Sequence, residues 1–333
     1  MADAQRDIEI RPPTVGDLHA IGELYRTVKG RPRPEPVTRH RLFDTPWGDS
    51  IAHIALDGDL CVGMVVYWPV ALRIAGEVVP GAQGMDAVTH PDYRGRPRLF
   101  LGLAKVGRDL TREQGIEVLY TFPNERSIKL TKHIGATYLG EVGAWGVELE
   151  ARRLRLPKLG RTASEVVAAT PDPAELDGLV AEAHSERDVV RIDKSPAWLA
   201  WRYSELSCER YEWLTLRNAS GSLAAAALLG ERDPESWGSD FAGIVRIHEL
   251  FARDVQVAES LLRQAAGRVR HRGGRKLDIL VKDPVLEQAV ERAGFQREKP
   301  HPMTTLSHRT GPFSADTLDF ARWRLISGDM DFF

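Results

Sequence analysis

Three features that would mark a specialised class of protein are scarce in this sequence of 333 residues. It has only two cysteines, Cys61 and Cys208, so a disulfide framework or a thiolate zinc site is not expected, and a reducing compartment fits. No apolar run approaches the ~18 residues that a membrane-spanning helix needs. The first residues, MADAQRDIEI, contain no basic segment followed by an apolar one. We therefore predict no secretory signal and expect a cytoplasmic protein.

Neither sign of charge is in excess, because 45 Lys and Arg face 47 Asp and Glu for a formal net charge of −2. A general nucleic-acid-binding protein carries a basic excess, so binding of nucleic acid is not predicted. Hydrophobic residues make up 43% and charged residues 28% of the chain, as in ordinary soluble proteins. The length is about twice that of one domain, and we expect two domains with buried cores.

The order of predicted elements in the first half recurs, loosely, in the second half. Both halves show a strand, two helices, a hairpin, a strand, a long helix, a strand, a helix and a strand. The long helices are expected at 98–114 and 258–272. In the first, Leu99, Leu103, Val106 and Leu110 recur at helical spacing and predict one buried apolar stripe. Such a repeated order with little identity suggests a tandem duplication. We expect an N-terminal domain, a basic linker, a C-terminal domain and a tail, at 1–150, 151–163, 164–310 and 311–333.

The linker RRLRLPKLGRT carries four Arg and one Lys and no acid, so it could hold phosphates or an acidic partner. Pro157 and Gly160 within it favour a solvated connection instead. The tail is expected to pack at the junction of the two domains, with Trp323 near a terminal strand. Asp329 and Asp331 stand two residues apart but have no further ligands spaced to help, so no metal site is predicted.

The most informative run is AVTHPDYRGR (87–96), which joins a predicted strand to the long helix at 98–114. The first amides of a helix have no intrahelical acceptor, and the helix dipole adds partial positive charge there. A strand, a turn and a helix start therefore make an anion site. Arg94, Arg96 and Arg98 would add counter-charge for a diphosphate.

This run resembles the GNAT acyltransferase superfamily, whose acyl-CoA signature Q/R-x-x-G-x-G/A follows a strand that commonly ends in V-x-P-x-Y-R-G. VTHPDYRGR is similar to this approach, and PNERSIKLTKHIGATYLG is similar to the family's Asn and short helix after the fifth strand. The resemblance covers 8–150 and, more faintly, 165–310. WLAWRY and WRLISGDMDFF resemble two-domain members found near polysaccharide and natural-product pathways, which implies bacterial secondary metabolism. The resemblance to the GNAT superfamily implies a mixed α/β fold of two tandem domains, each a twisted, mostly antiparallel sheet flanked by helices.

The resemblance implies that the N-terminal domain binds acetyl-CoA or another acyl-CoA as co-substrate, without a metal. Arg94 takes the first signature position, and Asn124 would bond the pantetheine arm or nearby backbone. The implied cofactor-binding residues are Val88, Arg94, Gly95, Arg96, Arg98, Leu99 and Asn124. Two positions depart from the signature, because Pro97 offers no N–H where the first glycine is expected and Leu99 stands where Gly or Ala is usual.

Transfer of an acyl group to an amine needs a base for the amine proton and can use an acid for the leaving thiolate. Asp86 lies where a family base or a ligand of ordered water often sits, and a strand hydrogen-bonding role is the alternative. His90 fits a turn residue better than a base. The usual family acid is a Tyr, but position 131 is Thr, so Ser127, Tyr120 or a water would serve. Tyr120 fits a core position as well.

The corresponding turn of the second half, FARDVQV (251–257), has no glycine and places Asp254 where phosphates would lie. Two negative groups repel, so we expect this domain to be degenerate, without acyl-CoA, and to complete the substrate-binding region. His248 and Glu249 could reach a substrate, or be ordinary strand residues. Three aromatic residues could stack on a sugar, or belong to the core: Trp198, Trp201 and Trp213.

Three functions stay open. The first is an acyl-CoA-dependent N-acyltransferase, most simply an N-acetyltransferase, that transfers groups other than aminoacyl groups to a primary amine of a small molecule, an amino sugar or a peptide-like intermediate. The second is a catalytically inactive binding module for a metabolite or partner protein, suggested by Pro97 and Thr131. The third takes aminoacyl groups from tRNA and requires steeply salt-dependent RNA binding, which the balanced charge disfavours.

Overall fold

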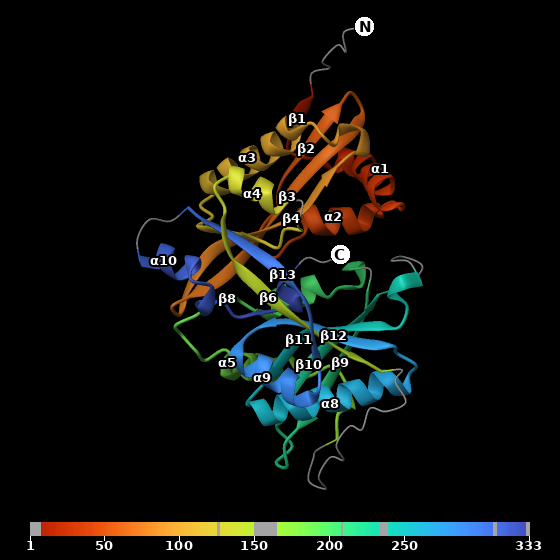
Figure 1. Cartoon of the computed structure of the whole chain (residues 1–333), viewed down its shortest axis with the longest axis vertical. Coiled ribbons are helices and arrows are strands. Elements are labelled where there is room, and N and C mark those ends of the chain that lie inside the picture. Colours follow the sequence, from red (N-terminus) through yellow and green to blue (C-terminus); the bar gives the residue numbers. More distant parts are fainter. Residues whose placement is uncertain are drawn as a thin grey trace. The chain divides into compact units, whose positions relative to one another are not determined.

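The structure is a computed structural model that describes residues 8–124, 127–149, 165–207, 209–232, 239–308 and 312–330. The chain forms two compact units (Figure 1). Unit 1 consists of Met1–Arg73, Glu77–Gly140 and Pro302–Phe320. Unit 2 consists of Ile74–Gly76, Glu141–His301 and Ala321–Phe333. The predicted linker at 151–163 lies outside the described residues.

The sheet of unit 1 has the strand order β1-β2-β3-β4-β5-β13. Its pairs β1–β2, β2–β3 and β5–β13 are antiparallel, whereas β4–β5 is parallel. The strands are β1 (Glu9–Arg11), β2 (Ile51–Asp57), β3 (Leu60–Ile74), β4 (Glu77–Thr89), β5 (Val118–Thr121) and β13 (Gln296–Ser307).

Helices cover both faces of this sheet, with α3 and α4 on one side and α1 and α2 on the other (Figure 1). They are α1 (Leu18–Lys29), α2 (Glu35–Phe43), α3 (Pro97–Glu113), α4 (Ile128–His133) and α10 (Pro312–Leu318). Leu99 and Leu103 of α3 enter the core against β2 and β3, as the sequence predicts. Val106 was expected in the same apolar stripe, but it is 37% exposed. The helix α2 is the second helix in the order predicted for the first half, although its bounds were not predicted.

The sheet of unit 2 has the order β6-β12-β11-β10-β9-β7, with only the β11–β12 pair parallel. A short strand, β14, pairs antiparallel with β12. The strands are β6 (Thr137–Glu148), β7 (Val167–Ala168), β9 (Glu209–Arg217), β10 (Leu223–Arg232), β11 (Ile244–Ala252), β12 (Lys276–Lys282) and β14 (Leu325–Ile326). A further short strand, β8 (Val190–Ile192), pairs with none of these.

Alternating residues of β10 serve two cores in unit 2. Ala225 and Ala227 pack in the large core with α8 and α9, while Ala226 packs with α5. Because successive strand residues point to opposite faces, α8 and α9 cover one face and α5 the other. The helices are α5 (Pro173–Ala183), α6 (Pro196–Arg202), α8 (Val255–His271) and α9 (Pro284–Ala293). Each unit is thus a mostly antiparallel sheet flanked by helices, which confirms the predicted fold class.

Two strands run from one unit into the other. β6 begins in unit 1, but its residues Gly143–Glu148 pair with β12 in unit 2. β13 begins in unit 2, but its residues Thr304–Ser307 pair with β5 in unit 1. Each sheet therefore receives a strand from the opposite half of the sequence. Among the described helices, none is long and apolar enough to cross a membrane.

Candidate functional site

Unit 1 contains a point where two parallel strands stop pairing. β4 and β5 are paired only from Gly81–Val118 to Gly84–Thr121. β4 then continues alone beyond Gly84 as far as Thr89, while β5 ends. In an open sheet with helices on its faces, ligands bind at such carboxyl ends of parallel strands.

The chain leads from the end of β4 directly into the predicted anion-binding turn. A 3-10 turn at Pro91–Tyr93 follows, then Gly95 with φ of 90°, and α3 begins at Pro97. The cap residue Arg96 offers no side-chain acceptor to the first amides of α3. Within the described residues, the structure gives the amides of Gly95 and Arg98 no acceptor. The start of α3 therefore keeps donors for an anion, although Pro97 supplies none.

The three arginines of this turn are exposed. Arg94 donates from Nε to the carbonyl oxygen of Thr89 over 3.3 Å, and the Arg96 guanidinium lies 4.8 Å from the centre of the Tyr93 ring. Arg98 makes no ion pair with a described residue. These cations are placed to add charge to the same helix start.

Two of the residues implied to bind the cofactor have buried side chains, which a ligand cannot contact. Val88 and Leu99 are both 6% exposed, and Leu99 belongs to the core under α3. The amide of Leu99 already donates to the carbonyl oxygen of Arg96 over 3.0 Å. The remaining backbone of this turn, rather than Leu99, can therefore reach an anion.

The loop after β5 holds two of the other predicted residues together. Asn124 is exposed, and its Oδ1 accepts from the Ser127 amide over 3.0 Å and from the Ser127 hydroxyl over 3.1 Å. Asn124 thus holds Ser127, the residue that precedes α4. Thr131, at the position of the usual family acid, is buried and donates its hydroxyl to the carbonyl oxygen of Ile128. Tyr120 on β5 is 1% exposed and packs edge-on against Phe122, as a core residue does.

Asp86 lies two residues beyond the last β4–β5 pair and is almost fully buried. Arg33 donates two hydrogen bonds to its carboxylate, over 2.6 and 2.8 Å, and Arg41 donates a third over 3.3 Å. Burial alone would raise the pKa of this carboxyl. The two guanidinium groups have the larger effect, so the pKa lies well below its ordinary value. A carboxylate with so low a pKa is a weak proton acceptor, so the geometry does not favour Asp86 as the base.

Two glycines allow the effect of the turn on ligand binding to be measured apart from its effect on stability. Gly95 and Gly115 both have positive φ, 90° and 78°, and neither has an atom within 4 Å of an added Cβ. Gly95→Ala and Gly115→Ala should therefore lower stability alike, by about 1 kcal/mol. Only Gly95→Ala should weaken acyl-CoA binding, by roughly tenfold, in isothermal titration. Equal affinities of the two variants would contradict a role for this turn.

The equivalent helix start in unit 2 is closed by its own side chain. Oδ1 of Asp254 accepts from the Val257 amide over 2.9 Å and so caps α8. This carboxylate occupies the donors that an anion would use and adds a like charge. Its position agrees with the prediction that the second half lacks a phosphate site.

The strands of unit 2 also stop pairing, but here another segment lies between them. β11 and β12 pair only from Ile244 to Arg246, and β14 then pairs with β12 through Val281–Ile326 and Lys282–Leu325. The next turn, Ser327–Asp329, packs on both β11 and β12. The Leu280 amide donates to Ser327 Oγ over 2.8 Å, so a side chain replaces a strand partner. The C-terminal segment 325–329 therefore fills this position in unit 2.

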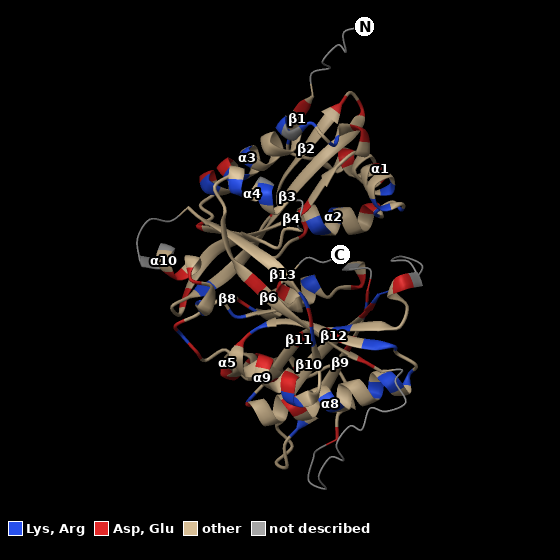
Figure 2. Ribbon diagram, viewed as in Figure 1, with Lys and Arg blue, Asp and Glu red and all other residues tan. Residues whose placement is uncertain are grey.

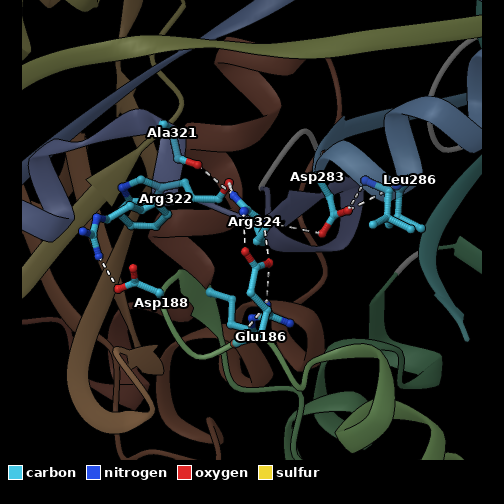
Figure 3. Close-up of polar contacts among 10 residues, drawn as sticks. Glu186, Asp188, Asp283, Leu286, Ala321, Arg322 and Arg324 are labelled. Atoms are coloured by element: carbon cyan, nitrogen blue, oxygen red, sulfur yellow. Dashed lines mark hydrogen bonds and ion pairs between the residues drawn. The ribbon is translucent and has the colours of Figure 1, made fainter. Parts of the chain in front are cut away.

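Arg322 and Arg324, which directly precede that segment, form ion pairs with other parts of unit 2 (Figure 3). Arg324 donates two hydrogen bonds to Glu186, over 2.8 and 3.0 Å, and lies 3.9 Å from a carboxylate oxygen of Asp283. Arg322 pairs with Asp188 over 2.5 Å. Asp283 accepts from the Leu286 amide and caps α9, which links the segment to that helix.

A buried ionic cluster holds the segment from the other side. Lys194 Nζ lies 2.8 Å from Glu249 Oε1, also pairs with Asp329, and sits 4.3 Å from the centre of the Trp198 ring. Tyr203 donates its hydroxyl to Glu249. Burial is the main cause that raises the pKa of Glu249. Asp329, considered above for metal binding, is thus an ion-pair partner, and no metal-ligand cluster occurs among the described residues.

His248 and Glu249 are fully buried rather than exposed on a strand face. His248 Nε2 lies 2.8 Å from Glu209 Oε2, and Arg232 lies 3.4 Å from Oε1 of the same carboxylate. Burial alone would raise the pKa of Glu209, but the larger opposing effect of His248 and Arg232 lowers this pKa to about 2. Trp198 is likewise 2% exposed, so it belongs to the core and not to a sugar platform.

Two pockets lie away from the predicted site residues of unit 1. A small pocket in unit 2 beside the C-terminal segment is lined by residues that include Arg191 and Lys194. An open groove in unit 1 is lined by residues that include Trp47 and Val78. It lies at the start of β4, so the candidate site is defined by the turn and helix start and not by this groove.

Sequence reasoning missed Arg33, Arg41 and Lys194, which carry the buried ion pairs of the two units. The available signal was the alternation of Arg and Pro in GRPRPEPVTRHR (30–41), which is unusual for a plain loop. Their partners lie 45 to 135 residues away in the sequence, and no local pattern indicates such pairings.

Comparison with known proteins agrees with this geometry. Residues 9–139 match the family described as acetyltransferase (GNAT) domain. A tandem GNAT protein from the clavulanic acid biosynthesis pathway is 16% identical, with a TM-score of 0.61 over 92% of this chain and 100% of that one. A probable N-acyltransferase from Enterococcus faecalis V583 is 13% identical, with a TM-score of 0.65 over 90% of this chain and 73% of that one.

Saccharomyces cerevisiae N-myristoyltransferase, solved with bound myristoyl-CoA, is 10% identical, with a TM-score of 0.63 over 92% of this chain and 81% of that one. The comparison with curated proteins gave no match. The match of residues 9–139 to the GNAT acetyltransferase domain identifies an acyltransferase. Over 92% of its length, the chain has the fold of a tandem GNAT protein.

Proposed function

We propose that the protein transfers an acyl group, most simply acetyl, from acyl-CoA to a primary amine of a small molecule, and that unit 1 carries the cofactor. The observation that carries the proposal is the contrast between two helix starts. Arg96 leaves the first amides of α3 without a side-chain acceptor, whereas Asp254 caps those of α8. An anionic group such as the CoA pyrophosphate can bind only where these donors are open.

The residues of unit 1 supply distinct parts of such a site. The amides of Gly95 and Arg98 are donors for the pyrophosphate, and the guanidinium groups of Arg94, Arg96 and Arg98 add charge. Asn124, in the loop after β5, would bond the pantetheine arm, and the β4 backbone at Val88 would receive the pantetheine amides. Bound acyl-CoA supplies the activated carbonyl.

The proposal also assigns the acid and the base of the transfer. Ser127 remains the candidate acid, because its hydroxyl is at the start of α4 and not in a core. Tyr120 is buried in the centre of the sheet, and Asp86 is held in ion pairs. We propose that the amine proton leaves to water, which is sufficient where orientation supplies most of the rate.

Turnover tests the proposal directly. Incubation of the protein and acetyl-CoA with a panel of amino sugars, amino acids and polyamines should release free CoA thiol above the rate without amine, detected with a thiol reagent. Absence of thiol release, together with tight acetyl-CoA binding, would instead support an inactive binding module. We also propose a cytoplasmic location, which fractionation of the producing cells tests.

One acyl-CoA per chain is the expected binding stoichiometry. Unit 2 has a capped helix start and a C-terminal segment between β11 and β12, so it offers neither the anion donors nor the space between strands. Native mass spectrometry with acetyl-CoA should show a single bound cofactor at saturation. Two bound molecules per chain would contradict this assignment of the units.

Figure 2 shows Lys and Arg interspersed with Asp and Glu on the helices of both units. The formal net charge of −2 is not the basic excess that a general RNA-binding protein carries. The proposal therefore names a small-molecule acceptor and not an aminoacyl-tRNA. Binding of tRNA that falls steeply between low and moderate salt would overturn this part.

A further inference from the structure

Asp86 has a backbone conformation that is uncommon for any residue other than glycine and is rare inside a strand. Its φ is 46°, in the left-handed region, and among the described residues only Ala75 shares a positive φ without being glycine. Ala75 lies in a hairpin turn, where this conformation is common. Asp86 instead lies inside β4, where β4 has separated from β5. Something must hold this strand residue in its strained state.

The surrounding side chains show what holds it. Arg33 forms a two-pronged ion pair with the Asp86 carboxylate, and Arg41 binds one of the same oxygens. The three side chains are 5 to 11% exposed, so water screens their attraction little. Charge-assisted, two-pronged hydrogen bonds of this kind also fix direction.

Each arginine is in turn fixed by an aromatic ring. The Arg33 guanidinium lies 3.7 Å from the centre of the Tyr25 ring in α1, and that of Arg41 lies 4.4 Å from the Trp68 ring in β3. The Arg41 carbonyl oxygen accepts from Trp68 Nε1 over 2.9 Å and from Ser50 Oγ over 2.7 Å. The segment 33–41 is thus tied to α1, β3 and β4 at once.

From this geometry we infer that Asp86, Arg33 and Arg41 are positioning residues for acyl transfer, and that Asp86 is not the base. The ion pairs hold the left-handed turn of β4 at residue 86, which sets the course of Ala87–Thr89 into the anion-binding turn. They also fix α2 against the same strand. The inference rests on the function proposed above and adds residues that the family signature does not contain.

Three substitutions of one residue separate positioning from proton transfer. Asp86→Gly and Asp86→Asn remove the charge but accept positive φ readily, whereas Asp86→Ala removes the charge and resists that conformation. A positioning role predicts that the Gly and Asn variants keep roughly tenfold more kcat/KM than the Ala variant. It also predicts an unchanged pH profile of kcat in the Gly and Asn variants.

A catalytic base predicts a different pattern. All three variants would then lose about 10²- to 10⁴-fold in kcat alike, and the acidic limb of the pH profile would disappear. That result would overturn the inference. Circular dichroism and thermal unfolding of each variant separate loss of fold from loss of activity, and kinetics are compared only among folded variants.

A double-mutant cycle gives a second, independent measurement. Arg33→Met should lower kcat/KM in the same direction as Asp86→Ala. The double variant Arg33→Met/Asp86→Ala should lose less than the sum of the two single losses, because the Arg33–Asp86 ion pair is removed in both. Arg33→Lys should restore part of the loss. Additive losses would overturn the inference. If the wild-type protein neither binds acetyl-CoA nor releases thiol, the proposed function itself fails, which is distinct from either pattern among the variants.

Discussion

Lys194→Met is expected to lower the free energy of unfolding of unit 2 by about 3–5 kcal/mol. The Lys194 side chain is 3% exposed and is the shared partner of Glu249 and Asp329, whose side chains are 0 and 3% exposed. Methionine has a similar shape but no charge, so two buried carboxylates would lose their common cation. The cost is that of leaving charges unpaired in the interior and exceeds the net worth of the ion pair itself.

Hydrogen exchange can locate this loss. The Leu280 amide donates to Ser327 Oγ, so it reports whether segment 325–329 stays in place. We expect faster exchange at Leu280 in Lys194→Met and a lower midpoint of urea unfolding. Arg217→Met is the matched control, because it breaks an equally short but exposed ion pair with Glu175 and should change little. A Lys194→Met protein as stable as the control would contradict a buried ionic cluster.

Arg98→Gln is expected to weaken acyl-CoA binding by about 10- to 100-fold, because one charge-assisted hydrogen bond is worth about 1.5–3 kcal/mol. Arg98 is exposed in the first turn of α3 and has no ion-pair partner among the described residues. Its replacement should therefore leave stability unchanged. The dissociation constant of acetyl-CoA, from isothermal titration, measures the effect.

Lys105→Gln is the matched control for that substitution. Lys105 is an exposed cation further along α3, so its loss changes the net charge by the same amount. Long-range attraction would weaken binding in both variants, and more at low salt. A specific contact weakens it only in Arg98→Gln. Equal losses in the two variants would show that Arg98 does not contact the cofactor.

The anion-binding turn could be predicted from the sequence because its determinants are local. The strand end, Gly95, the arginines and the apolar stripe of α3 follow one another within about thirty residues, and a helix start binds anions whatever its surroundings. Leu99 and Leu103 confirm the predicted buried face. The prediction that Val106 is buried was wrong, because helical spacing alone does not say how far the sheet extends beneath the helix.

Pairings between distant residues could not be predicted in this way. The partners of Asp86 lie 53 and 45 residues away, and the two prolines in 34–36 hide where α2 begins. Proline fits the first turn of a helix, so α2 nonetheless begins there. Similarly, the sequence shows β6 and β13 as strands but not that each pairs within the opposite unit.

Hydrogen–deuterium exchange with and without acetyl-CoA tests most directly whether the start of α3 holds the cofactor. The account predicts slower exchange over residues 89–100 on addition of acetyl-CoA, and no change over 251–258 at the start of α8. Protection at α8 instead, or no protection at either helix start in a folded protein, would contradict it.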